Sequence, residues 1–479
     1  MHLELSEKKQ WLALFLLSLG YATIYLDMTA LNIALPFIQK AFGSTNTELF
    51  WIVNTYIVTT ACCALAGGRL GDIFGLRNVF LVGVSSFGLA SIGCALSFSS
   101  NSLIFWRAFQ GIGGALTIAT SAASIYQIFP KEKQGKAMGF FGLTSVLFIT
   151  LGPTVGGIFT QYMSWRGIFW INPCIGMISC YYIYVLLKGM DQHRDREATF
   201  DYIGQFLLVG FMLPIIVALM QAPKWGWTSP IILNLFLMGA AFFAFFVFYE
   251  RKQKHPLFDF AMFQNSNFKV AIPLFFCSQF AVVSNVLLAL YLEKSLGYKP
   301  VVAGLALLPG AFFGFFGNPI AGSFIDRFGT KRVIQLGLLG AIVAFTWLAF
   351  TAHTLHYGFM FVALLLISVA LPFYMVGIFV MAMQTASENQ KGMVAGISMT
   401  MRQTGGAFAV AFMSLIIGVF EQKYEGVLTP KETFTKGYSA AMLLIVVALG
   451  VALYTSIWIG QEKVSEDMAE DVLSVDAEG

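Results

Sequence analysis

Fourteen long apolar runs recur along this chain, and they constrain its fold more than any other feature of the sequence. An α-helix needs about 20 apolar residues to cross a lipid bilayer. The runs lie near residues 11–36, 50–68, 78–98, 102–127, 136–160, 165–187, 203–222, 230–249, 267–292, 300–322, 332–352, 357–384, 393–420 and 437–460. Only 11% of the residues are charged, whereas soluble domains contain about one quarter. We therefore predict an all-α membrane protein with 14 transmembrane helices.

The distribution of lysine and arginine predicts how these helices are oriented. If the N-terminus is inside, the inside segments hold 19 of the 29 lysines and arginines, and the outside segments hold eight. Because segments rich in these residues tend to stay in the cytoplasm, we expect both termini there. The expected location is the inner (cytoplasmic) membrane of the cell. The first apolar run has no small-residue cleavage site after it, so we expect it to remain as a span.

An internal repeat predicts how the helices are grouped. The segment GRLGDIFGLRNVF at 68–80 follows the second run, and GSFIDRFGTKRVI at 322–334 follows the tenth, 254 residues later. A weaker echo relates Gly135 and Gly139 to Gly392 and Gly396. Two six-helix bundles with two extra helices between them explain these positions. Such parallel repeats suit alternating access, with a site between the halves.

The expected division of the chain follows from this repeat. Its parts are a cytoplasmic N-terminus at 1–10, an N-terminal six-helix bundle at 11–187, a linker with two extra transmembrane helices at 188–266, a C-terminal six-helix bundle at 267–460 and a disordered cytoplasmic tail at 461–479. The tail is acidic and has little apolar surface to bury, which is typical of disordered ends.

The repeated segments predict a loop that controls conformational change. The residues concerned are Gly68, Asp72, Gly75 and Arg77 in the first copy and Gly322, Asp326, Arg327 and Gly329 in the second. Glycines permit a tight turn. An aspartate can cap the N-terminus of the next helix and pair with a basic neighbour, which would hold one packed state of two moving helices. The alternative is a pair of ordinary polar turns.

Asp27 is the one carboxylate placed deep inside a predicted span. A charge at that depth costs about 3 kcal/mol on insertion scales, so such an acid usually carries protons, contacts substrate or forms a buried ion pair. Arg107 in the fourth span is predicted at a similar depth. We expect a direct or water-bridged link between the two. Two interpretations of this pair are open: it takes part in proton coupling, or it is a static structural ion pair.

Other intramembrane residues are weaker candidates. Gly152, Pro153, Gly156 and Gly157 lie close together in the fifth span. Small residues let helices approach closely, and an internal proline bends a helix, so a hinge, a contact between the halves and simple close packing are all open. The remaining candidates, expected to line a cavity, are Asn32, Gln110 and Arg402.

The sequence offers no motif for enzymatic chemistry. It contains no GxxxxGK[ST] phosphate-binding loop, no GxSxG or HExxH, and no CxxC pair among its six cysteines. The five histidines lie in the N-terminus or in predicted loops. We therefore expect no catalytic residue, metal site, cofactor or nucleic-acid partner. Energy for transport would come from an ion gradient or from the substrate's own gradient.

Several motifs together resemble one family, from about residue 10 to residue 460. They are LDMTALNIALP at 26–36, GRLGDIFGLR at 68–77, RAFQGIGGA at 107–115, LGPTVGG at 151–157, WRGIFWINPCIG at 165–176 and FDYIGQ at 200–205. The chain resembles the fourteen-helix EmrB/QacA-type drug:proton antiporters of the major facilitator superfamily. That resemblance implies proton coupling through Asp27 and Arg107 and an antiporter motif at 151–157. The chain departs from the pattern at Ile73, where the family usually has a basic residue.

The resulting expectation is a proton-coupled exporter of amphipathic, cationic or neutral drugs, which would confer antibiotic resistance. The alternatives are dedicated export of one metabolite such as a siderophore, lipid or antibiotic, proton-coupled uptake, and a non-transporting receptor or channel. Some members of the family also work with a periplasmic adaptor and an outer-membrane channel, so such partners are part of what the resemblance implies.

Overall fold

The computed structural model describes residues 6–188, 199–254, 256–387, 390–424 and 427–460. Within these ranges the chain forms fourteen long α-helices. They are α1 (Glu7–Phe42), α2 (Asn46–Phe74), α3 (Leu76–Ala95), α4 (Ser100–Ile128), α5 (Lys131–Tyr162), α6 (Gly167–Leu186), α7 (Tyr202–Trp225), α8 (Pro230–Glu250), α9 (Ser266–Lys294), α10 (Pro300–Phe328), α11 (Thr330–Thr351), α12 (Tyr357–Gln384), α13 (Lys391–Lys423) and α14 (Pro430–Ser456). Each predicted span coincides with one helix, so the predicted all-α fold is confirmed.

Thirteen of these helices are long and apolar enough to cross a membrane. The exception among the described helices is α4, which carries Arg107 and Gln110 as well as many serines and threonines. It packs between α2 and α3 and buries most of its residues. Its polar side chains therefore face protein, which explains how a less apolar helix fits into the bundle.

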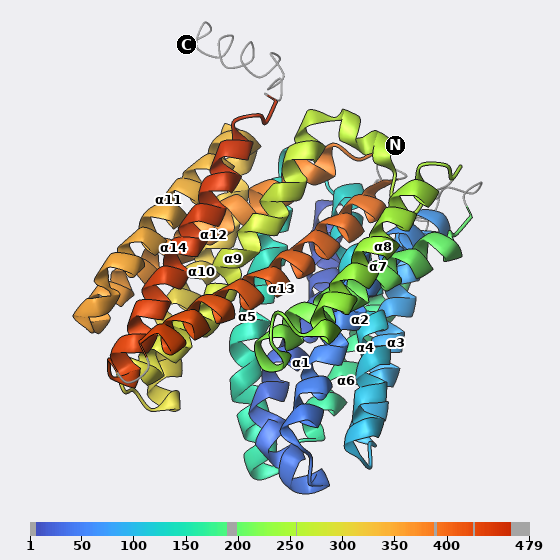
Figure 1. Ribbon diagram of the computed structural model, residues 1–479. Coiled ribbons are helices and arrows are strands. Elements are labelled where there is room, and N and C mark those ends of the chain that lie inside the picture. The colour runs from blue at the N-terminus through green and yellow to red at the C-terminus, as the bar shows by residue number, and fades with distance from the viewer. Residues whose placement is uncertain (1–5, 189–198, 255, 388–389, 425–426, 461–479) are drawn as a thin grey trace, which may run out of the picture.

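The helices form two groups with a helical hairpin between them in the chain (Figure 1). In the first group α5 and α6 pack on α1, while α2 and α3 pack on α4. In the second group α11 packs on α12 and α14, and α9 packs on α13 and α14. The α7–α8 hairpin contacts both groups, through α2 and α13.

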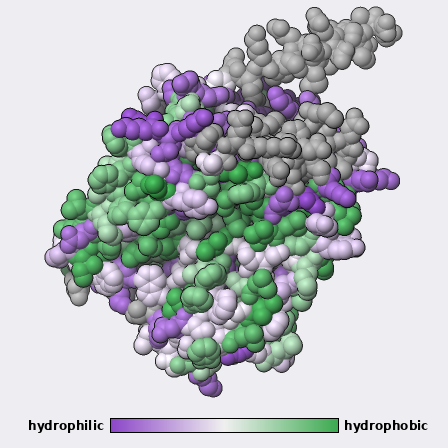
Figure 2. Space-filling model, turned by 90° about the vertical axis from the view of Figure 1, so that its right-hand side faces the viewer, coloured by the Kyte–Doolittle hydropathy of each residue, from purple (hydrophilic) through white to green (hydrophobic). Residues whose placement is uncertain are grey.

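The two groups meet mainly through two helix pairs, α2 with α13 and α5 with α10. In Figure 1 they lie close together near the chain termini and diverge toward the opposite end. We call the end where α1 begins and α14 ends the terminal face, and the other end the far face. Figure 2 shows a band of hydrophobic residues around the middle, with hydrophilic residues gathered mainly toward the terminal face.

The turns after α2 and α10 use the glycines of the repeat. Gly75 and Gly329 have φ values of 95° and 81°, which side chains other than glycine rarely adopt. Each glycine separates two helices that follow each other almost without a loop, α2–α3 and α10–α11. The predicted tight turns are therefore present at equivalent positions of both copies. Residues 189–198, near the start of the predicted 188–266 linker, and the predicted tail at 461–479 lie outside the described residues.

Candidate functional site

Asp27 lies in the interior of the first group of helices, where it pairs with Arg107. The Arg107 Nη1 donates to Asp27 Oδ2, and both side chains are almost completely buried. The Arg107 Nε donates to the carbonyl oxygen of Ile52 at 3.1 Å. Its guanidinium also lies over the ring of Tyr56, 4.5 Å from the centroid. The expected link between the two charges is thus direct, and α2 holds the arginine in place.

The second carboxylate oxygen of Asp27 is held by two amides. Gln110 Nε2 donates to Asp27 Oδ1 at 3.0 Å, and Asn172 Nδ2 donates to the same atom at 2.7 Å. Both amides also reach the Ser91 hydroxyl, at 2.8 and 3.2 Å. Side chains from α1, α3, α4 and α6 therefore form one buried network around a single carboxylate. Such a network is most stable when all its members are satisfied.

Sequence reasoning placed Gln110 in a cavity wall and did not select Asn172 or Ser91. The structure places Gln110 fully buried in the Asp27 network, where its Oε1 also accepts from Arg107 Nη1 at 2.6 Å. Asn172 lies inside the apolar helix α6, and this isolated amide in a membrane span was the available signal. Ser91 carried no such signal, because serine is frequent in membrane helices and usually bonds to its own backbone.

The two other candidates for a cavity wall lie apart from this network. Asn32 is exposed and follows Tyr25 by seven residues, so both share one face of α1. Arg402 is half-buried in α13, in the second group of helices.

The glycines of the predicted antiporter motif contact α1 just after Asp27. A Cβ added at Gly152 would overlap the Thr29 hydroxyl, and one at Gly156 would lie 2.7 Å from the carbonyl oxygen of Ala30. Gly157, in contrast, has no heavy atom within 4 Å of an added Cβ. Pro153 lies within α5. The motif therefore brings α5 close to the segment of α1 that carries Asp27, and Gly157 takes no part in that contact.

The two repeated loops join the two groups of helices at the terminal face. Asp72 accepts hydrogen bonds from the backbone N–H groups of Gly392 and Met393, both at 2.8 Å. Asp326 accepts from Gly135 and Lys136, both at 2.9 Å. Each aspartate thus caps a helix of the opposite group, α13 or α5, and not the helix that follows it in the chain as expected. The partial positive charge of a helix N-terminus favours this contact.

Glycines allow the backbones to approach at both junctions. A Cβ at Gly68 would overlap the carbonyl of Gly392, and a Cβ at Gly322 would overlap that of Gly135. Each repeated segment therefore faces a glycine of the weaker echo across the interface between the groups: Gly68 faces Gly392, and Gly322 faces Gly135.

The basic residues of the two loops bind the sixth helix of their own group. Arg77 Nη2 donates to the carbonyl of Tyr184 in α6 at 2.6 Å. Lys331 Nζ donates to the carbonyls of Ile457 and Ile459, at and beyond the end of α14, at 2.9 and 2.8 Å. Cations are favoured at helix C-termini. Arg327, which follows the second aspartate, is exposed.

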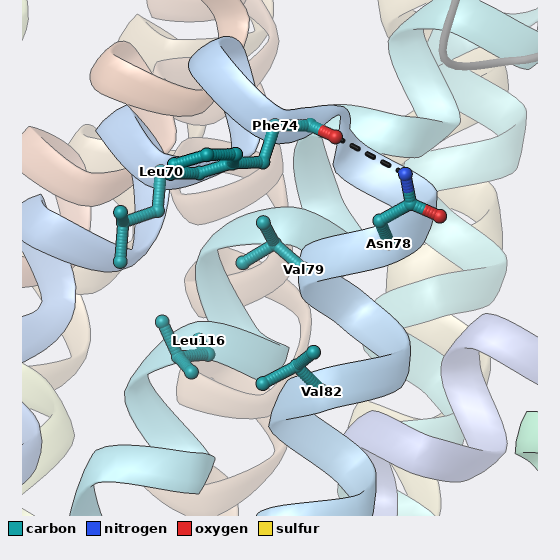
Figure 3. Close-up of a pocket in the computed structure, with 6 residues that line it drawn as sticks. All are labelled: Leu70, Phe74, Asn78, Val79, Val82 and Leu116. Carbon is teal, nitrogen blue, oxygen red and sulfur yellow. Dashed lines mark hydrogen bonds between the residues drawn. The ribbon is translucent and has the colours of Figure 1, made fainter. Parts of the chain in front are cut away.

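A cavity of about 390 Å³ lies between α2, α3 and α4, away from the Asp27 network (Figure 3). Its lining is mainly apolar and consists of Leu70, Phe74, Asn78, Val79, Val82 and Leu116. Its polar member, Asn78, donates to the carbonyl of Phe74 at 3.2 Å, so the amide supports the turn. Phe74 and Val82 are 53% and 59% exposed, so the cavity opens at the surface of the helices.

Comparison with known protein families gives a direct match. The family model of the Major Facilitator Superfamily matches residues 17–249 and 191–410. Among curated proteins, the chain is 29% identical over 415 residues to the multidrug resistance protein Stp of Mycobacterium tuberculosis, covering 86% of this chain and 77% of that protein. It is 27% identical to the tetracenomycin C resistance and export protein of Streptomyces glaucescens, covering 88% and 80%. It is 28% identical to the methylenomycin A resistance protein of Bacillus subtilis, covering 90% and 93%.

Solved structures with the same fold include the human organic anion transporter MFSD10, with a TM-score of 0.66, 15% identity and coverage of 92% of this chain and 99% of that one. The proton:xylose symporter XylE gives a TM-score of 0.65 at 14% identity, covering 92% and 95%. At these identities the likeness concerns the fold alone. The relatives named for multidrug and antibiotic resistance confirm the resemblance seen in the sequence motifs. With its family match spanning both groups of helices, this multi-pass membrane protein belongs to the Major Facilitator Superfamily.

Proposed function

We propose that this protein is a proton-coupled secondary exporter of amphipathic drugs or other toxic compounds that works by alternating access. The observation that carries the proposal is the buried Asp27 network. A carboxylate held by an arginine and two amides inside a membrane protein can exchange its charge-neutralising partner for a proton. Because intramembrane acids are costly, they are usually retained for such a role.

The arrangement of the two groups supports a specific state in the cycle. The hydrogen bonds that Asp72 and Asp326 accept join the groups at the terminal face, and the groups diverge toward the far face (Figure 1). With the terminal face in the cytoplasm, as the lysine and arginine distribution predicts, this is an outward-facing state. The inner membrane and cytoplasmic termini are part of the proposal.

In the proposed cycle Asp27 takes up a proton from outside and releases it inside after the halves rock. Transferring one charge through 100 mV yields about 2.3 kcal/mol, which is sufficient for a roughly fifty-fold concentration gradient. The printed names of the relatives support export of drugs or antibiotics. The tetracenomycin C protein, named for one compound, favours dedicated export of a single metabolite as the second candidate. A periplasmic adaptor and an outer-membrane channel remain proposed partners.

The test is transport by the purified protein in liposomes. Ethidium and a panel of antimicrobials would first be screened in a host without its own pumps, and one exported compound would be carried forward. With an imposed pH gradient, we expect the parent to accumulate the compound and Asp27→Asn to lose proton-driven transport. Exchange of labelled for unlabelled compound without a gradient should persist in Asp27→Asn, because it needs no proton. Unchanged proton-driven transport by this variant would remove Asp27 from the mechanism.

A further inference from the structure

The FDYIGQ motif, which the proposed function does not use, lies where the α7–α8 hairpin begins and ends. Asp201 precedes α7 and caps it, since its Oδ1 accepts from the Gly204 N–H at 2.7 Å. The same oxygen accepts from the Tyr249 hydroxyl of α8 at 3.2 Å. Glu250 is the last residue of α8 and is 2% exposed, and its Oε2 accepts from the Phe258 N–H at 3.3 Å. Two carboxyl groups therefore meet at the base of the hairpin.

The second oxygen of each carboxyl group lies against Gly204. A Cβ added to this glycine would be 2.3 Å from Glu250 Oε1 and 2.8 Å from Asp201 Oδ2, so the two oxygens are close to each other. Both are enclosed by protein, and neither has a hydrogen-bond partner among the described residues. The oxygens of an ionised carboxylate can only accept hydrogen bonds. If both groups were ionised, they would repel each other with no donor between them.

A buried arginine compensates for one of these two charges. Gln205 Nε2 donates to the Cys62 carbonyl at 3.0 Å, which joins the first turn of α7 to α2. Arg69 follows Cys62 by seven residues, so it lies on the same face of α2, two turns closer to the terminal face and to the start of α7. It is 5% exposed, and its charge also acts on the Glu250 carboxyl. A second buried negative charge would have no counter-ion here and would be strongly destabilising.

The charged residues that follow α8 do not supply the missing partner. Arg251 and Lys252 are exposed and lie over neighbouring aromatic rings. Asp259 accepts from Gln390 Nε2 at 3.1 Å, on the side of α13. Among the described residues, the titratable and charged groups that face the Glu250 carboxyl are therefore Arg69, Asp201 and Tyr249.

We propose that Asp201 and Glu250 share one proton and form a proton-binding site at the terminal face, separate from Asp27. With the proton on Glu250 Oε1, this atom donates to Asp201 Oδ2, and both enclosed oxygens have a partner. One proton together with Arg69 makes the cluster neutral. Loss of the proton leaves two adjacent carboxylates with a single cation, which destabilises the base of the hairpin. The inference does not depend on the compound that is transported.

Infrared spectroscopy of the protein in lipid nanodiscs tests this site, because a protonated carboxyl group gives a C=O band that a carboxylate lacks. At neutral pH we expect the parent to show this band and Glu250→Gln to lose the intensity of one carboxyl group. Asp201→Asn should lose the same intensity, because Arg69 then compensates for an ionised Glu250. In the parent, the band should disappear as the pH is raised.

The thermal unfolding of the same samples provides a second measurement. An exposed glutamate has lost its proton well below neutral pH, so the folded parent holds one proton that the unfolded chain does not. Its stability therefore falls as the pH rises, until the folded protein also loses the proton. We expect the midpoint of unfolding to fall more steeply with pH in the parent than in Glu250→Gln.

Glu421→Gln is the matched control, because it removes an exposed glutamate near the end of α13 and should leave the band unchanged. Asp27→Asn should also keep the band, which separates this site from proton coupling: lost gradient-driven transport with an intact band affects only the latter. A parent without the band, a band that persists in Glu250→Gln, or one that keeps its full intensity in Asp201→Asn would each overturn the assignment. Stabilisation of the parent by sodium ions in place of protons would overturn it as well.

Discussion

The two junctions at the terminal face, α2 with α13 and α5 with α10, are built on the same contact, but their aspartates are buried to different depths. In both, an aspartate accepts hydrogen bonds from two backbone N–H groups near the N-terminus of a helix in the opposite group, in the first turn of α13 and in the second turn of α5. Asp72 is 4% exposed, whereas Asp326 is only partly buried. The first junction also includes Lys391, whose Nζ donates to the Tyr126 carbonyl at 2.9 Å in the opposite group.

Both copies of the repeat therefore form the same aspartate-to-backbone contact, but we expect the contact to be stronger in the copy that is more deeply buried. A buried, charge-assisted hydrogen bond contributes about 1.5–3 kcal/mol, and an exposed helix cap typically about 1 kcal/mol. The α2–α13 junction should therefore do most to hold the terminal face closed, and the α5–α10 junction should support it.

The largest effect is expected where a side chain would separate the helices. Gly392→Val and Gly135→Val each add atoms where the Cβ alone would overlap Gly68 or Asp326. We expect both to prevent closure of the terminal face and reduce gradient-driven transport to background. Spin labels at Lys131 and Arg332, on opposite groups, should report a longer distance by electron paramagnetic resonance.

Gly157→Val is the control for this pair of variants, because nothing lies within 4 Å of its added Cβ. It should transport at close to the parental rate. Closure that persists in Gly392→Val but fails in Gly135→Val would reverse the proposed ranking of the junctions.

A moderate effect is expected from the aspartates themselves. Asparagine keeps one acceptor oxygen and loses the charge, so each variant retains part of its cap. From the values above, we expect Asp72→Asn to shift the equilibrium away from terminal-face closure by about tenfold and Asp326→Asn by about threefold. The same spin-label pair measures both populations. Equal shifts would show that burial does not rank the two junctions.

Much of this organisation was predictable from the sequence, because it depends on local patterns. Apolar length fixed the fourteen helices, and the pairing of Asp27 with Arg107 followed from two charges that each needed a partner. The glycine echoes at Gly135 and Gly392 were also visible.

The sequence could not predict which helices pack against each other. Asp72 lies next to α3 in the chain, and only the packing of α2 on α13 makes Gly392 and Met393 its partners. Ser91 and Asn172 joined the Asp27 network for the same reason, since contacts among α1, α3, α4 and α6 depend on tertiary packing.

The smallest effect is expected at the basic residue of each loop. Arg77 is 9% exposed, and its guanidinium also lies 4.8 Å from the centroid of the Tyr184 ring. Lys331 is partly buried and binds carbonyls near the end of α14. Because the buried contact is stronger, Arg77→Ala should lower the midpoint of thermal unfolding by about 3 °C and Lys331→Ala by about 1 °C.

Two further variants decide what this last difference means. Arg332→Ala removes an exposed charge on the same turn as Lys331 and should leave the midpoint unchanged. Arg77→Lys keeps the charge but loses the planar fork that reaches both the carbonyl and the ring. An intermediate midpoint for Arg77→Lys would assign the difference between the loops to the shape of the side chain. A midpoint equal to the parent's would assign it to charge alone, and the two loops would then be equivalent despite their unequal burial.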